Sequence, residues 1–241
     1  MIIDIKEVER MNLKNPIIIE GFPGIGMIGT ISTSYLADKM KMEPLGYISS
    51  SHFPPITAIH DYKPVSPARI YASEEHNLIV LFSEFVIPSD VVYPLSQKIM
   101  KFAKDKKVKE IYSLAGIAAE QPNRKIYGIS STKDMGEKLK KNGIELIKEG
   151  ATQGVSGLLI AECMSNRFPA ANMLIQTAKV MDPKGASELL TKLSQIIDVE
   201  INVKPLLEEA NGFEKKMKDS MEKIKSLHEK YNEMGDNPMY A

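Results

Sequence analysis

The chain has 241 residues, which is enough for one sizeable hydrophobic core with an appendage. Lysine plus arginine number 31 and aspartate plus glutamate also number 31, so there is no excess of positive charge to bind phosphate backbones, and we expect no nucleic-acid partner. A single cysteine, Cys163, excludes an internal disulfide and a cysteine-based metal cluster, which suits a reducing cytosol.

The N-terminus and the apolar stretches of the chain also bear on where the protein is located. The first ten residues lack a basic start followed by a long apolar run, so they do not resemble a signal peptide. No apolar stretch approaches the roughly 18–20 residues that span a bilayer. We therefore expect a cytoplasmic protein without membrane segments.

The first predicted element is a buried parallel strand. Residues 17–19 are three isoleucines, a run that is too short for a helix and apolar on both faces. A glycine-rich turn over residues 21–29 follows, and from Ile28 apolar residues recur at helical spacing. Strand, glycine turn and helix together predict the opening of a βαβ unit.

The next segment is rich in proline. From residue 41 to about residue 71, prolines disfavour helix and are tolerated only at strand edges or in turns, so we expect irregular structure. Residues 70–72 and 78–82 are expected to form two strands joined by a polar turn.

Helices and strands alternate through the rest of the core. We expect helices at 89–104, 131–142, 157–164 and 183–197, and strands at 108–115, 127–130, 144–147 and 174–177. This alternation predicts an α/β fold with a mostly parallel sheet.

The character of the sequence changes after Pro205. Apolar residues recur every three or four positions among dense lysines and glutamates as far as Met234, which predicts one long amphipathic helix. Its apolar stripe needs a cover, which is the body of the same chain, a neighbouring subunit or a partner. We divide the chain into a core domain (1–204), this helix (205–234) and a tail (235–241).

The spacing Gly24-x-Gly26-x-x-Gly29 after a strand matches the dinucleotide fingerprint. That fingerprint needs an acidic residue about 20 positions later to hold the ribose, and here residues 47–53 contain none. Pro23 also lies inside the turn. We favour a tight packing turn with positive φ and keep ligand binding at this turn as an alternative.

No catalytic or metal site is legible in the sequence. The four histidines, His52, His60, His76 and His228, lack metal-ligand spacing, so we predict no metal. The run Gly154-Val155-Ser156-Gly157 is not a complete nucleophile elbow.

Three carboxylates lie near the ends of apolar runs, where α/β folds gather their sites: Glu84, Glu120 and Glu162. They are either proton-transfer groups or satisfied polar groups at subunit contacts, and we favour the second reading. We predict no cofactor and no enzymatic activity.

The chain ends in Met239-Tyr240-Ala241, behind the helix breaker 235–238. A tyrosine ring supplies apolar area and a hydroxyl that needs a hydrogen-bond partner, and a terminal carboxylate can be captured by backbone donors or a cation. These three residues are our candidate partner-binding site.

Several stretches together resemble one family, the archaeal relatives of the proteasome assembly chaperones, in the same superfamily as the second eukaryotic assembly chaperone. The stretches are Glu20–Gly26, Phe53–Pro55 with His60–Tyr62, Glu84–Pro88, Gly116–Ala118 and Gly154–Leu159. The resemblance covers about residues 15–210. It implies a three-layer α/β/α phosphorylase/hydrolase-like fold used for assembly without known catalysis, and it implies homo-oligomers.

In family members with a terminal hydrophobic-Tyr-X motif, the tail inserts between α-subunits of the 20S proteasome. The resemblance implies that Met239 is the hydrophobic position, Tyr240 the tyrosine and Ala241 the free carboxylate, with helix 205–234 as the arm that carries them. No G-x-x-x-x-G-K-[ST] motif occurs, so any proteasome activation is expected to be ATP-independent.

By analogy with tail-bearing relatives we expect a tetramer. Two alternatives stay open. One is an enzyme or binding protein for a small nucleoside-like or phosphorylated ligand at Gly24–Gly29. The other is an oligomeric scaffold whose long helix binds a different partner.

Overall fold

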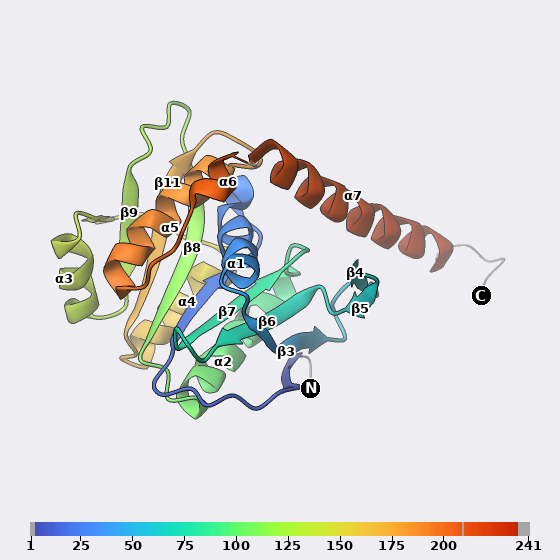
Figure 1. Cartoon of the computed structure of the whole chain (residues 1–241), viewed down its shortest axis with the longest axis horizontal. Helices are drawn as coiled ribbons and strands as arrows, with labels where there is room; N and C mark the ends of the chain where they lie inside the picture. The colour runs from blue at the N-terminus through green and yellow to red at the C-terminus, as the bar shows by residue number, and fades with distance from the viewer. Residues whose placement is uncertain (1–2, 209, 236–241) are drawn as a thin grey trace.

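A nine-stranded sheet runs through the part of the chain that the computed structural model describes, residues 3–208 and 210–235 (Figure 1). The strand order is β1-β3-β6-β7-β2-β8-β11-β9-β10. The strands of this sheet are β1 Ile3–Glu7, β2 Ile17–Gly21, β3 Glu43–Ser50, β6 Ala68–Ser73, β7 Leu78–Ser83, β8 Glu110–Ala118, β9 Ile126–Ser130, β10 Glu145–Leu146 and β11 Ala170–Thr177. A separate hairpin consists of β4 Ala58–His60 and β5 Lys63–Val65.

The helices are α1 Ile28–Lys39, α2 Ser89–Asp105, α3 Lys133–Lys141, α4 Gly154–Ser165, α5 Pro183–Ile197, α6 Lys204–Glu208 and α7 Ala210–Gly235, and one 3₁₀ turn covers Ile25–Met27. None of these described helices combines the length and the apolar character that crossing a bilayer requires.

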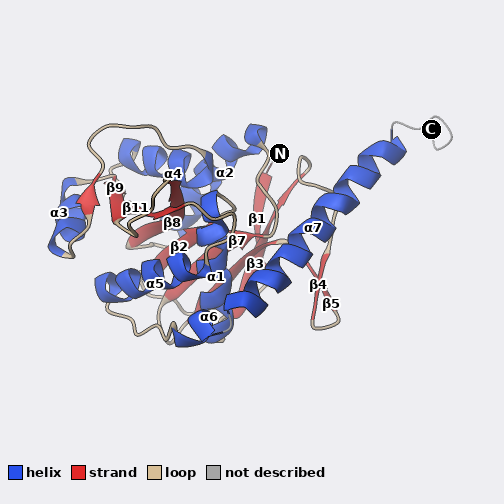
Figure 2. Ribbon diagram, turned by 90° about the horizontal axis from the view of Figure 1, so that it is seen from above, coloured by secondary structure: helices blue, strands red, loops and turns tan. Residues whose placement is uncertain are grey.

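The centre of the sheet is parallel. Strands β7, β2, β8 and β11 pair in parallel with one another, in that order. At one edge β1, β3 and β6 form an antiparallel wing that joins β7, and on the other side β9 runs antiparallel to β11. Helices α2 and α4 cover one face and α1 and α5 cover the other (Figure 2). The predicted α/β fold with a mostly parallel sheet is therefore confirmed.

The isoleucine strand explains why both faces carry helices. Along β2, Ile18 packs into the α2–α4 side and Ile19 into the α1–α5 side, and both are fully buried. Successive strand residues point to opposite faces, so a strand that is buried between two layers favours apolar residues at successive positions. Each such side chain contributes about 1.5–3 kcal/mol relative to an exposed one.

Helix α5 begins and ends where local chemistry predicts. The Asp182 carboxylate accepts a hydrogen bond from the Gly185 amide at 2.9 Å, and Pro183 occupies the first turn, where its missing N–H costs nothing. Asp198 ends the helix in the left-handed conformation at φ 55°.

The prediction of irregular structure for residues 41–71 was wrong in part. This segment contains β3, which pairs with both β1 and β6, and also the β4–β5 hairpin. Proline is accommodated because the register between β3 and β6 shifts between Pro44 and Gly46. The edge strand β1 was not predicted.

Candidate functional site

The glycine turn after β2 is filled by the protein's own backbone. Gly26 has a φ of 68°, which favours glycine. A Cβ on Gly29 would lie 2.3 Å from the Leu114 carbonyl oxygen, and one on Gly21 would lie 2.2 Å from the Gly29 carbonyl oxygen. These glycines let α1 approach β2 and β8 closely, as expected for a tight packing turn.

A hollow of about 430 Å³ opens beside this turn. Its walls include Ile25, Glu120, Thr177 and Val180, from the loops that follow the parallel strands. Asp182, behind it, accepts hydrogen bonds from Thr177 Oγ1 at 2.6 Å and from an Arg124 nitrogen at 2.5 Å. This ion pair fixes the loop before α5.

The pKa of Asp182 is set by two opposing effects. Burial raises it, and the hydrogen bonds from Arg124, Thr177 and the Gly185 amide outweigh burial, so the pKa lies below its ordinary value. Asp182 is therefore a charged anchor for α5.

The three carboxylates singled out in the sequence lie in different surroundings. Glu84 is buried at the end of β7 and pairs with Arg69 and His60. Glu120 is exposed in the loop after β8, and Glu162 on α4 accepts a hydrogen bond from Asn166 at 3.1 Å. Among the described residues, no hydrogen bond or shared partner connects these carboxylates, and Glu84 and Glu162 serve structural contacts within the chain.

A fourth carboxylate, which the sequence reasoning did not select, is the most deeply buried. Glu20 at the end of β2 has no exposed surface, and burial raises its pKa although the hydroxyls of Ser113 and Ser156 and the Phe22 amide lie within hydrogen-bonding reach. Its Oε1 atom has no hydrogen-bond partner in the described part of the chain.

Glu20 belongs to a polar row across the central strands. Glu20 is in register with Ser113 of β8, and Ser113 is in register with Asn172 of β11. Asn172 is also fully buried, and neither of its amide atoms has a partner among the described residues. The sequence does contain a signal for a buried carboxylate at Glu20. This glutamate directly follows three isoleucines, and a strand with such a run is buried on both faces.

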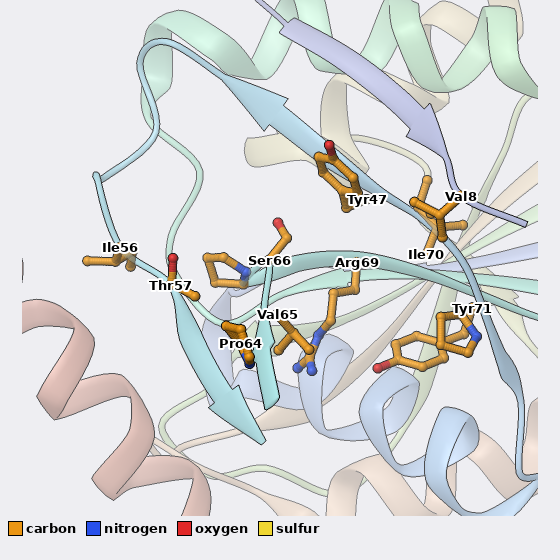
Figure 3. Close-up of a pocket in the computed structure, with 13 residues that line it drawn as sticks. Val8, Tyr47, Ile56, Thr57, Pro64, Val65, Ser66, Arg69, Ile70 and Tyr71 are labelled. Atoms are coloured by element: carbon orange, nitrogen blue, oxygen red, sulfur yellow. The ribbon is translucent and has the colours of Figure 1, made fainter. Parts of the chain in front are cut away.

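The β4–β5 hairpin and the end of β7 bring together segments of the resemblance that are distant in sequence. His60 Nε2 lies 2.7 Å from Glu84 Oε1, and the Phe53 and Phe85 rings meet edge to face at 4.8 Å between centroids. A groove of about 590 Å³ separates the hairpin from β3 and β6 (Figure 3). Ile56 at its end points toward α7 (Figure 3).

Helix α7 leaves the body as an arm (Figure 1). Its contacts with the body include Met221, which packs on the α1–α5 core, and Ile224, which is 9% exposed and belongs to the α2–α4 core. Farther along, Leu227 and Tyr231 are exposed. The predicted partner-binding residues Met239, Tyr240 and Ala241 lie outside the described residues.

Comparison with known proteins identifies relatives of this chain. The model of the PAC2 family matches residues 18–221. An uncharacterized protein of Methanocaldococcus jannaschii is 31% identical over 97% of this chain and 96% of its own length.

Two solved structures from Pyrococcus furiosus share the fold. PbaA, described as an archaeal homolog of proteasome-assembly chaperone, has 26% identity and a TM-score of 0.83 over 93% of this chain and 99% of its own. PbaB, described as an archaeal proteasome activator, has 22% identity and a TM-score of 0.76 over 90% of this chain and 98% of its own, a likeness in fold.

Proposed function

Because the chain belongs to the PAC2 family, we propose that it is a proteasome-binding assembly chaperone or ATP-independent activator. In this proposal Met239, Tyr240 and Ala241 dock into pockets between α-subunits of the 20S proteasome. The core (1–204) serves as the body, residues 205–234 as the arm and residues 235–241 as the docking tail. The protein acts in the cytoplasm as a homo-oligomer, with a tetramer as the expected form.

The direction of α7 is the observation that carries this proposal. A helix of 26 residues extends from the body, and the exposed side chains of Leu227 and Tyr231 follow the body contact at Ile224. A helix of this length spans about 39 Å, which is longer than docking against the body requires. Similarity to PbaA, whose description names a proteasome-assembly chaperone homolog, supports the same partner.

Several identical tails on one oligomer make weak single contacts sufficient. Once one tail is bound, the others meet their pockets at a high effective concentration. A hydrophobic side chain, a tyrosine hydroxyl and a terminal carboxylate are each easy to remove or displace separately, so the docking chemistry can be dissected residue by residue.

The test measures affinity for 20S proteasome from the same cell by surface plasmon resonance. We expect loss of binding for a chain without residues 239–241, for Tyr240→Ala, and for a chain extended beyond Ala241, which moves the carboxylate. Tyr231→Ala is the matched control, since it removes an exposed tyrosine from the arm and leaves the tail intact. Equal binding by the truncated and full chains would contradict the tail mechanism.

The alternative of a small ligand at Gly24–Gly29 receives less support from the geometry. Within this turn, a Cβ on Gly26 would lie 2.8 Å from a Thr177 methyl group and one on Gly29 would lie 2.3 Å from the Leu114 carbonyl oxygen, so both glycines serve packing within the chain. A thermal shift by a nucleotide or nucleoside that is lost in a folded Gly26→Val variant would favour the ligand-binding reading.

A further inference from the structure

Helix α4 has almost no charge on any side. Its twelve residues include one charged side chain, Glu162, whereas six of the nine residues of α3 are charged. The inward side of α4 buries Leu159 and Cys163. A surface helix with so little polar character on its outward side is typical of a helix that is covered on both sides.

The outward side of α4 is apolar. Leu158, Ala161 and Met164 follow one another at three-residue spacing and are all exposed, and Met164 has 67% of its surface open to solvent. Scattered apolar residues are ordinary on a surface, but three in succession on one helix face indicate a contact surface.

Helix α2 extends this surface. It lies beside α4 on the same side of the sheet (Figure 2), and it contributes Tyr93, which is 56% exposed. Val86, in the loop just before α2, is 68% exposed. We call the outward side of α4, together with Tyr93 and Val86, the α2–α4 face.

Charged groups of both signs border the α2–α4 face. Lys101 pairs with Asp105 at 2.9 Å, and Lys104 donates to Asn166 at 2.6 Å. Asn166 in turn donates to the Glu162 carboxylate at 3.1 Å. The face therefore presents no unpaired block of one sign among the described residues.

We propose that a second copy of this chain covers the α2–α4 face, in a two-fold contact that places α4 against α4. In a two-fold contact each patch meets itself, so a patch with net charge of one sign would repel its copy. An apolar centre with charges of both signs at its border satisfies this condition. Ala161, between Leu158 and Met164, allows close approach of the two helices.

A contact through the α2–α4 face rests on the proposed function in one respect, because that function requires several copies in one oligomer. This surface joins the copies, whereas the tail binds the proteasome. The two ideas fail separately, because removing residues 239–241 leaves the α2–α4 face intact.

The experiment compares the molar mass of the full chain and its variants by light scattering across a dilution series. Leu158→Glu and Met164→Glu are expected to raise the dissociation constant of the two-fold contact at least about tenfold, the ratio equivalent to 1.4 kcal/mol. Thr191→Glu, an exposed position on α5 across the sheet, is the control and is expected to keep the mass of the wild type. Circular dichroism establishes that each variant is folded.

A mixing experiment tests the two-fold arrangement itself. Two α4 helices related by a two-fold axis place Leu158 opposite Leu158 when they run parallel, and opposite Met164 when they run antiparallel about Ala161. Leu158→Glu is therefore expected to dissociate alone and to reassociate when mixed with Leu158→Lys in the first case, or with Met164→Lys in the second. A wild type with the mass of one copy overturns the proposal, as does a folded Leu158→Glu variant with unchanged mass. A folded Leu158→Glu variant that reassociates with neither lysine variant overturns the two-fold arrangement.

Discussion

His60 Nε2 lies 2.7 Å from Glu84 Oε1, and the Arg69 guanidinium contacts the same carboxylate oxygen. The two partners of Glu84 come from β6 and from the β4–β5 hairpin, so one side chain at the end of β7 ties the hairpin to the sheet. The Arg69 and Glu84 side chains are only 12% and 11% exposed, whereas that of His60 is 43% exposed. The arginine–glutamate contact is therefore the buried part of the cluster.

Glu84→Ala is expected to lower the free energy of unfolding by about 3–5 kcal/mol, because it leaves Arg69 buried without its counter-ion. Urea denaturation measures the change. The control is Asp105→Ala, which removes the exposed partner of Lys101 and is expected to cost less than about 1 kcal/mol. Equal losses of unfolding free energy in the two variants would show that burial of the Arg69–Glu84 pair does not determine its contribution to stability.

Asp182→Asn is expected to destabilise the protein at neutral pH and to have a smaller effect in acid. The folded-state pKa of Asp182 lies below its ordinary value, so its charge contributes stability above that ordinary value, and this contribution is lost as pH falls through the folded-state pKa. The difference in free energy of unfolding between wild type and Asp182→Asn, measured from pH 7 down to acid, therefore shrinks. Asp182→Ala also removes the N-terminal cap of α5, which lowers the free energy of unfolding by about 0.5–2 kcal/mol more.

Glu20→Gln is expected to have a pH dependence opposite to that of Asp182→Asn: the variant becomes more stable relative to the wild type as the pH rises. Burial raises the folded-state pKa of Glu20, so the folded state binds the proton more tightly than the unfolded state, and ionisation destabilises the fold as pH rises above the ordinary carboxyl range. The variant should gain stability relative to wild type as pH increases. A constant difference between pH 4 and pH 8 in urea denaturation would rule out a raised pKa at this position.

Ile224→Ser is expected to release the arm without unfolding the core. Ile224 is 9% exposed and lies far along α7, so its loss weakens the attachment of the helix more than the packing of the sheet. Hydrogen exchange should accelerate across α7 and stay unchanged in β2 and β8. Leu227→Ser, at an exposed position one turn later, should leave exchange in α7 near that of the wild type.

The elements that were predictable are those fixed by local chemistry. Asp182-Pro183 and Asp198 bound α5, and the isoleucines of β2 require burial on both faces, so short stretches of sequence were sufficient. Strand β3 was missed because its pairing with β1 and β6 depends on contacts that are distant in sequence and override the preferences of Pro44.

The surroundings of the buried carboxylates Glu20 and Glu84 could not be predicted from the sequence. The environment of Glu20 arises from Ser113 and Ser156, which come from β8 and α4, and no periodicity in the sequence reports that assembly. The partners of Glu84 in the structure, Arg69 and His60, were likewise not predicted from the sequence. Met239, Tyr240 and Ala241 remain a prediction, since they lie outside the described residues.

The contact between Ile224 and the body lies near the middle of α7, and His228, one turn later, is half-buried. Eleven residues of helix follow Ile224 as far as Gly235, a length of about 16 Å at 1.5 Å per residue. A rotation of α7 by about 10° about Ile224 would move the end of the helix by about 3 Å for this length. Small adjustments of packing around one isoleucine would thus move the end of α7 by about the distance that separates hydrogen-bonded atoms.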